Sequence, residues 1–70
     1  MNYIYVVSDD WHGVVGYYYS KTNATKEVNI IASEQYKLPL DTPLDYNSED
    51  LYGWDGVASW RRESVVRGEG

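Results

Sequence analysis

Residues 3–19, Tyr-Ile-Tyr-Val-Val-Ser-Asp-Asp-Trp-His-Gly-Val-Val-Gly-Tyr-Tyr-Tyr, decide the fold class of this 70-residue chain. Residues 3–7 are β-branched or aromatic and contain no breaker, which predicts a strand. Residues 8–13 end that strand, because Asp and Ser bond to their own backbone and Gly accepts a positive φ. Residues 14–19 are again apolar and aromatic. We therefore expect an antiparallel hairpin, with a bulge or a close backbone approach at Gly16.

The hydrophobic spacing changes after this hairpin and becomes that of a helix. Apolar side chains recur at offsets of 0, 4, 7, 8 and 12 residues, which places them on one helical face. These residues are Ala24, Val28, Ile31, Ala32 and Tyr36. Ser20 is suited to the N-cap, and Pro39 disfavours helical geometry at the residue before it. The pattern predicts a helix over residues 21–37.

The second half of the chain has a weaker pattern. Residues 38–50 contain two prolines and predict a long connection. An unattached loop of this length is uncommon in a small domain, so its leucines are expected to pack on the core. They are Leu38, Leu40 and Leu44. Residues 57–66 supply a third strand, with a short fourth strand before it.

Together these elements predict an α+β fold. We expect one domain over residues 1–70, with residues 68–70 as a frayed tail. The sheet is expected to be antiparallel with three or four strands, and one helix packs on a face, in the order ββα followed by one or two strands.

Composition excludes several classes of function. The chain has 11 acidic and 6 basic residues, a net charge of −5, one His and no Cys. Without thiols it has no disulfide framework and no thiolate zinc site, and the usual ligands of a transition metal are missing. No apolar run is long enough to span a membrane, and the first residues lack the basic start of a signal peptide. We expect a cytoplasmic, non-enzymatic protein without metal or cofactor.

Two local patterns come close to known sites and fall short. Residues 45–50 open like a calcium loop, but Asp50 stands where the turn needs Gly, and Gly56 stands where the bidentate Glu belongs. Residues 8–12 hold a hydroxyl, carboxylates and an imidazole. A catalytic triad needs such groups to converge from a scaffold, which neighbours in one short turn rarely do.

The middle of the chain is acidic and aromatic. Residues 38–60 contain five acids and no Lys or Arg, and the aromatic residues of the chain are Tyr and Trp, with no Phe. Tyr and Trp are enriched at protein interfaces, and carboxylates on a rigid surface can mimic DNA phosphates. The predicted partner-binding residues are Asp41, Asp45, Tyr46, Glu49, Asp50, Tyr52, Trp54, Asp55 and Trp11.

The partner expected for this segment is a protein with a basic surface, such as a nucleic-acid-processing or immune effector complex. A net-negative chain is repelled by phosphate, so we expect no direct binding to nucleic acid, and none to membranes. The alternative is that the acidic segment is a solvated loop that keeps a small protein soluble.

In the first half of the chain, a strand at residues 3–7, a short acidic loop, a second strand that ends in Tyr19-Ser20 and a helix follow one another. This layout resembles that of small phage and prophage proteins of uncharacterised function. In size and character such proteins are similar to anti-CRISPR and other anti-defence inhibitors. The resemblance implies a stoichiometric inhibitor of a host immune complex in the host cytoplasm. The alternative is a structural or accessory phage homo-oligomer, a homodimer for example, because so small a sheet has open edges.

Overall fold

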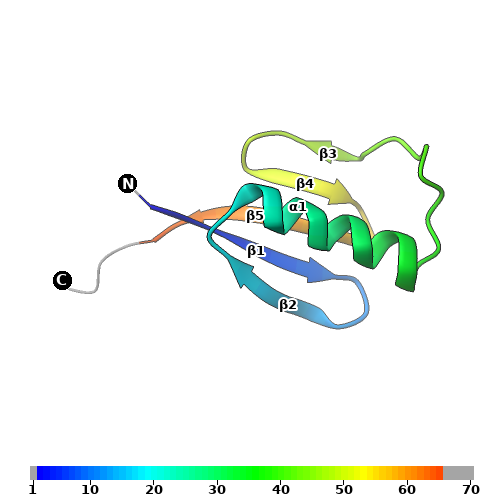
Figure 1. Cartoon of the computed structure of the whole chain (residues 1–70), viewed down its shortest axis with the longest axis horizontal. Helices are drawn as coiled ribbons and strands as arrows, with labels where there is room; N and C mark the ends of the chain where they lie inside the picture. Colours follow the sequence, from blue (N-terminus) through cyan, green and yellow to red (C-terminus); the bar gives the residue numbers. More distant parts are fainter. Residues whose placement is uncertain (1, 66–70) are drawn as a thin grey trace.

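The computed structural model describes residues 2–65, and in that range one helical segment packs on one face of a five-stranded antiparallel sheet (Figure 1). The elements are β1 (Tyr3–Asp9), β2 (Gly13–Tyr18), α1 (Lys21–Ile30), η1 (Ile31–Gln35), β3 (Tyr46–Asn47), β4 (Leu51–Trp54) and β5 (Ala58–Ser64). The strand order is β2-β1-β5-β4-β3. The predicted α+β fold is confirmed. The sheet exceeds the expected three or four strands because a two-residue strand, β3, pairs with β4.

The β1–β2 hairpin contains the predicted irregularity. Val7 lies opposite Gly16 and Ser8 lies opposite Val14, so Val15 is an extra residue on β2. A β-bulge of this kind bends its strand and increases the local twist. The bulge therefore lies directly before Gly16, where the sequence placed either a bulge or a close approach.

The helix begins where it was predicted and ends differently. Ser20 is the N-cap, and its side chain accepts a hydrogen bond from the Asn23 backbone N–H. The last turn, η1, is a π-helix, in which the Tyr36 N–H donates to the Ile31 carbonyl at 3.3 Å. The prediction of a uniform α-helix up to residue 37 is therefore wrong for the last turn. Apolar residues spaced three or four apart do not reveal the extra residue in a π-helical turn.

A left-handed residue ends the helical segment. Lys37 has a φ of 56°, and the N–H of Leu38 donates to the Ala32 carbonyl at 2.9 Å. This arrangement is like the Schellman motif that ends many helices, widened by the π-turn. The chain then turns toward β3.

The core lies between the helical segment and one face of the sheet. The predicted stripe is buried at Ala24, Val28, Ile31 and Ala32. From the sheet, Trp60 is fully buried between two rings: Tyr52 stacks on it at 5.9 Å between ring centroids, and Tyr5 meets it edge-on at 5.0 Å. The Trp60 Nε1–H donates to the Thr25 Oγ1 at 2.9 Å, so the buried indole is satisfied by the helix.

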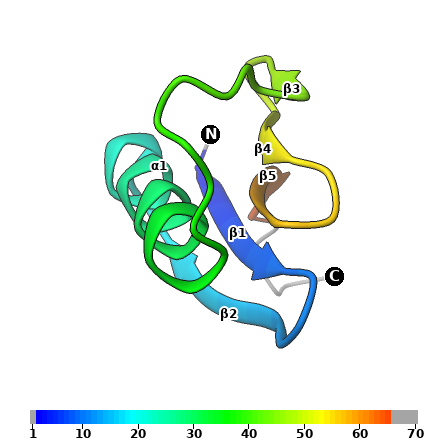
Figure 2. The ribbon, with the colours of Figure 1, turned by 90° about the vertical axis from the view of Figure 1, so that its right-hand side faces the viewer.

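The opposite face of the sheet has no helix over it within residues 2–65 (Figure 2). Side chains alternate along a strand, so Val7 and Trp60 point to the helix while Val6 and Arg61, the next pair, point away. Val6 is still buried, whereas Val14 and Tyr17 on β2 are 47% and 65% exposed. We call this surface the open face.

The 38–45 loop is only partly attached to the core. Leu38 and Leu44 are half-buried, as predicted, but Leu40 is 96% exposed. The Thr42 N–H donates to the Pro39 carbonyl at 3.1 Å, which places Leu40 inside a tight turn that projects from the molecule. The prediction for Leu40 is therefore wrong. No helix within the described range has the length and apolar character needed to cross a membrane.

Candidate protein-binding site

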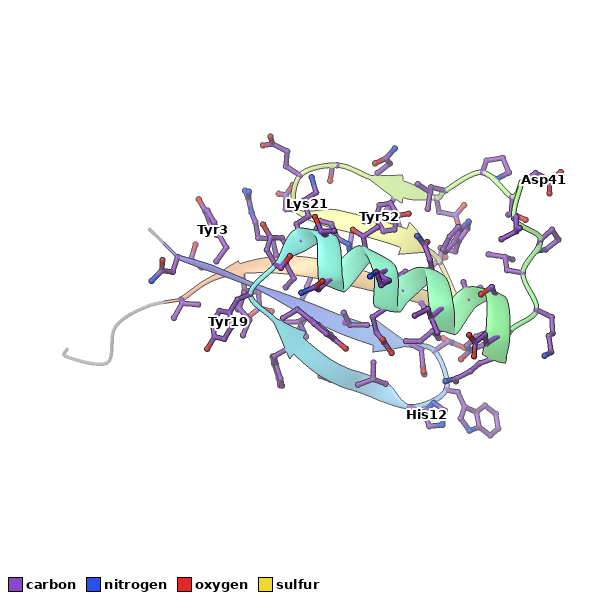
Figure 3. All side chains as sticks on the ribbon, in the orientation of Figure 1. Tyr3, His12, Tyr19, Lys21, Asp41 and Tyr52 are labelled. Carbon is purple, nitrogen blue, oxygen red and sulfur yellow. The ribbon has the colours of Figure 1, made fainter. Side chains whose placement is uncertain are left out.

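Three chain segments meet at one end of the molecule, which we call the acidic end. They are the β1–β2 turn, the 38–45 loop and the β4–β5 turn, and they carry the exposed acids Asp10, Asp41, Asp45 and Asp55. Figure 3 shows Asp41 and His12 at this end, while Tyr3 and Lys21 lie toward the other. Glu34 and Lys37, at the end of the helical segment, add opposite charges that offset each other.

Hydrogen bonds hold the segments of the acidic end together. The Asp10 N–H donates to the Val57 carbonyl at 3.0 Å, which joins the β1–β2 turn to the β4–β5 turn. The Asp55 N–H donates to the Asp45 Oδ2 at 2.8 Å, which joins the β4–β5 turn to the 38–45 loop. Asp10, Tyr46 and Asp55 line one shallow hollow. The carboxylates are thus placed by backbone contacts between distant parts of the chain.

Tyr46 lies among these carboxylates. The negative charge of Asp55 raises the pKa of the Tyr46 hydroxyl, and partial burial, a hydrogen bond to the Asp55 side chain and the charge of Asp45 act in the same direction. A hydroxyl that donates to a carboxylate is stabilised in its neutral form. Tyr46 therefore presents a neutral hydroxyl beside two acids at neutral pH.

The structure separates Glu49 and Asp50 from the other predicted acids. Both lie in the β3–β4 turn, and the Asp50 carbonyl accepts the Arg62 N–H at 2.8 Å. Strand β4 runs from this turn to the acidic end, and four residues of strand span about 13 Å. Glu49 and Asp50 consequently lie near the cationic residues of β5, at the other end of the hairpin.

The aromatic members of the predicted site have different surroundings. Tyr52 and Trp54 are half-buried against the core; the Tyr52 hydroxyl donates to Asn29 Oδ1 at 3.1 Å and the Trp54 Nε1–H to the Thr42 carbonyl at 3.4 Å. These rings attach β4 to the helix and to the loop. Trp11 is 82% exposed at the tip of the first hairpin. Among these three rings, Trp11 offers the largest free surface.

Asp9 organises that tip, and sequence reasoning treated it only as a turn residue. Its carboxylate is buried and accepts hydrogen bonds from the Trp11 N–H at 2.9 Å, from the His12 N–H, and from His12 Nδ1 at 3.0 Å. Burial alone raises the pKa of the Asp9 carboxyl, but the bonds and charge of His12 and the bond from Trp11 outweigh it and hold the pKa below the ordinary value. The sequence signal for this role was the position of Asp9, two residues before Trp11 in a short turn.

Cations at the opposite end lie against rings and an acid. The Arg62 guanidinium lies 4.2 Å from the Tyr3 ring centroid, and the Lys21 ammonium lies 5.9 Å from that of Trp60. Arg61 pairs with Glu63 at 2.6 Å. Over residues 2–65 no three His, Cys, Asp or Glu side chains are grouped so that they could hold a metal ion.

Comparison with known proteins gave no match: no family model, no curated protein and no solved structure matches the chain.

Proposed function

We propose that the chain is a non-catalytic inhibitor of the kind that phages direct against host defence complexes. It acts in the host cytoplasm by covering a basic, nucleic-acid-binding surface with its acidic end. The observation that supports the proposal best is the convergence of Asp10, Asp45 and Asp55 from three chain segments, at the end of the molecule that also carries Asp41 and the exposed Trp11. The phage and anti-CRISPR class comes from the resemblance of the first half of the chain.

The acidic end has the charge that such a task requires. The Asp45 carboxylate is held by the Asp55 backbone N–H, so its negative charge is fixed in place before a partner binds, which lowers the ordering cost of binding. A cluster of one sign attracts a surface of the other sign and accelerates the encounter, and salt weakens this attraction.

Trp11 adds an apolar contact to this charge. Exposed Trp side chains are common among the residues that dominate binding energy at interfaces, because they bury a large area with few rotatable bonds. The three hydrogen bonds that the buried Asp9 accepts hold the backbone of the tip in one shape. The ring is therefore presented outward before a partner arrives.

The proposal is tested by competition with nucleic acid. CRISPR effector complexes purified from bacterial hosts are incubated with increasing amounts of the chain, and their binding to labelled target DNA is measured. We expect one complex to lose DNA binding in proportion to the chain added, with weaker inhibition at higher salt. Full DNA binding by every complex at a saturating excess of the chain would contradict the proposal.

A matched pair of variants locates the surface. The double variant Asp10→Lys, Asp41→Lys reverses two exposed charges at the acidic end and is expected to weaken inhibition strongly. The double variant Glu49→Lys, Asp50→Lys makes the same change in net charge at the other end and is expected to inhibit like the unmodified chain. Equal effects of the two pairs would show that overall charge, and not the acidic end, is responsible.

A further inference from the structure

Strand β2 forms an edge of the sheet that lacks most of the usual protection. It has six residues, Gly13 to Tyr18, and among residues 2–65 it pairs with β1 alone, whereas the other edge strand, β3, has two residues. Natural edge strands are commonly shortened, or carry Lys or Pro, because their free backbone groups pair readily with another strand. β2 contains no charge and no Pro, and the bulge at Val15 is the protective feature it does carry.

The charge of the chain favours this edge for self-association. The net charge is −5, so two copies repel each other wherever acids face acids. Residues 11–20 form the longest stretch without Asp, Glu, Lys or Arg. Two copies can approach along this stretch without bringing like charges together.

We propose that two copies of the chain pair antiparallel through β2 and form a continuous ten-stranded sheet. The pairing is isologous, about a two-fold axis perpendicular to the sheet, so both helices lie on the same side. The axis lies between Val15 and Gly16. This proposal is independent of the proposed inhibition, since β2 is not part of the acidic end.

The bulge makes this register consistent. Val14 pairs with Ser8, and Tyr17 pairs with Val6. Because Val6 and Ser8 both point to the open face, Val14 and Tyr17 share that face. In a regular strand, residues three positions apart would point to opposite faces. With the axis after Val15, Val14 of one copy lies opposite the partner's Tyr17, and this pair occurs twice. A β-branched side chain beside an aromatic one is a stabilising cross-strand pair.

The antiparallel arrangement also suits the uneven charge of the molecule. Antiparallel pairing directs the two acidic ends to opposite ends of the joined sheet. Each acidic end then lies on the same side as the opposite end of the other copy, where the cations Lys21 and Arg62 are found together with acids such as Glu63. The dimer therefore keeps the two acidic ends apart.

The mass of the chain in solution tests the dimer. Sedimentation equilibrium over a concentration series is expected to give a mass twice the 8.1 kDa of one chain. Amide exchange in β2 is expected to slow as concentration rises, because pairing protects the edge. A single-chain mass at every concentration would overturn the proposal.

Two variants with the same change of charge identify the edge. Tyr17→Lys puts a cation into the seam and is expected to give the mass of one chain, while circular dichroism shows that it is folded. Ile30→Lys alters an apolar residue of α1 that is 40% exposed and lines a hollow with Leu40, away from β2, and is expected to stay dimeric. A folded Tyr17→Lys variant that keeps the dimer mass would exclude β2 as the interface.

Discussion

The two faces of the sheet are made by the same strands and are stabilised differently. On the face under the helix, Trp60 is fully buried between Tyr5 and Tyr52, and its polar atom is bonded to Thr25. On the open face, Val6 is buried, whereas Tyr17 is exposed. The comparison teaches that the face under the helix holds the ring cluster of the core, while the exposed side chains of the open face, such as Tyr17, are available to a partner.

The largest expected effect comes from deleting a ring on each face. Trp60→Ala removes the centre of the ring cluster and should cost about 3–5 kcal/mol, which is close to the whole stability of so small a domain. Tyr17→Ala removes a ring of the open face that is 65% exposed and should cost far less, about 1 kcal/mol. Urea denaturation followed by circular dichroism measures both, and similar losses would refute the distinction between the faces.

A second test concerns the close backbone approach between β4 and β5 at Gly53. Gly53 has a φ of 139°, and a Cβ at this position would overlap the carbonyl oxygen of Ala58. Gly53→Ala should therefore cost about 2 kcal/mol or more, because the strands must move apart. Gly56→Ala is the control: its φ is 74°, but a Cβ there would meet nothing within 4 Å. It should lose about 1 kcal/mol, from backbone strain alone. The order of the two melting temperatures checks this, and a reversed order would contradict it.

The smallest expected effect is the pH dependence due to Asp9. The pKa of its carboxyl is held below the ordinary 3.8, so the folded state binds this proton less readily than the unfolded state. Its contribution to stability is complete above the ordinary value and is lost as pH falls through the lowered one. Asp9→Asn should cost about 1 kcal/mol at neutral pH, and the difference from the unmodified chain should shrink in acid.

Asp10→Asn removes the neighbouring carboxylate and serves as the control, because Asp10 is exposed and its contact with Val57 is made by the backbone. It should have little effect on stability at neutral pH. Denaturant titrations at several pH values distinguish the two variants. A constant difference between Asp9→Asn and the unmodified chain at every pH would contradict the role given to Asp9.

Local patterns predicted the elements that depend on neighbouring residues. The hairpin, the bulge beside Gly16, the Ser20 cap and the buried helical stripe all follow from spacing or turn chemistry. The strand β3 was missed because two residues of strand carry no periodicity and exist only through pairing with β4. Leu40 was misplaced because the sequence did not reveal the turn after Pro39.

The candidate site was less predictable for the same reason. Asp45 and Asp50 are close in sequence, yet Asp45 lies at the acidic end and Asp50 lies in the β3–β4 turn, at the opposite end of β4. Asp10 was not among the predicted partner-binding residues, but the bond of its N–H to Val57 brings it beside Asp55. Which acids become neighbours depends on strand pairing between distant residues, and a single sequence does not give that pairing directly.

The three tryptophans lie in three different environments, which has a practical consequence. Trp60 is sealed from water, Trp54 is half-covered and Trp11 is almost free. Their fluorescence should therefore separate into a short-wavelength component from Trp60 and a long-wavelength component from Trp11 that acrylamide quenches. A ligand seated on the hairpin tip would shield only the latter, and unfolding would change the former, so the chain carries its own optical reporters for the two events.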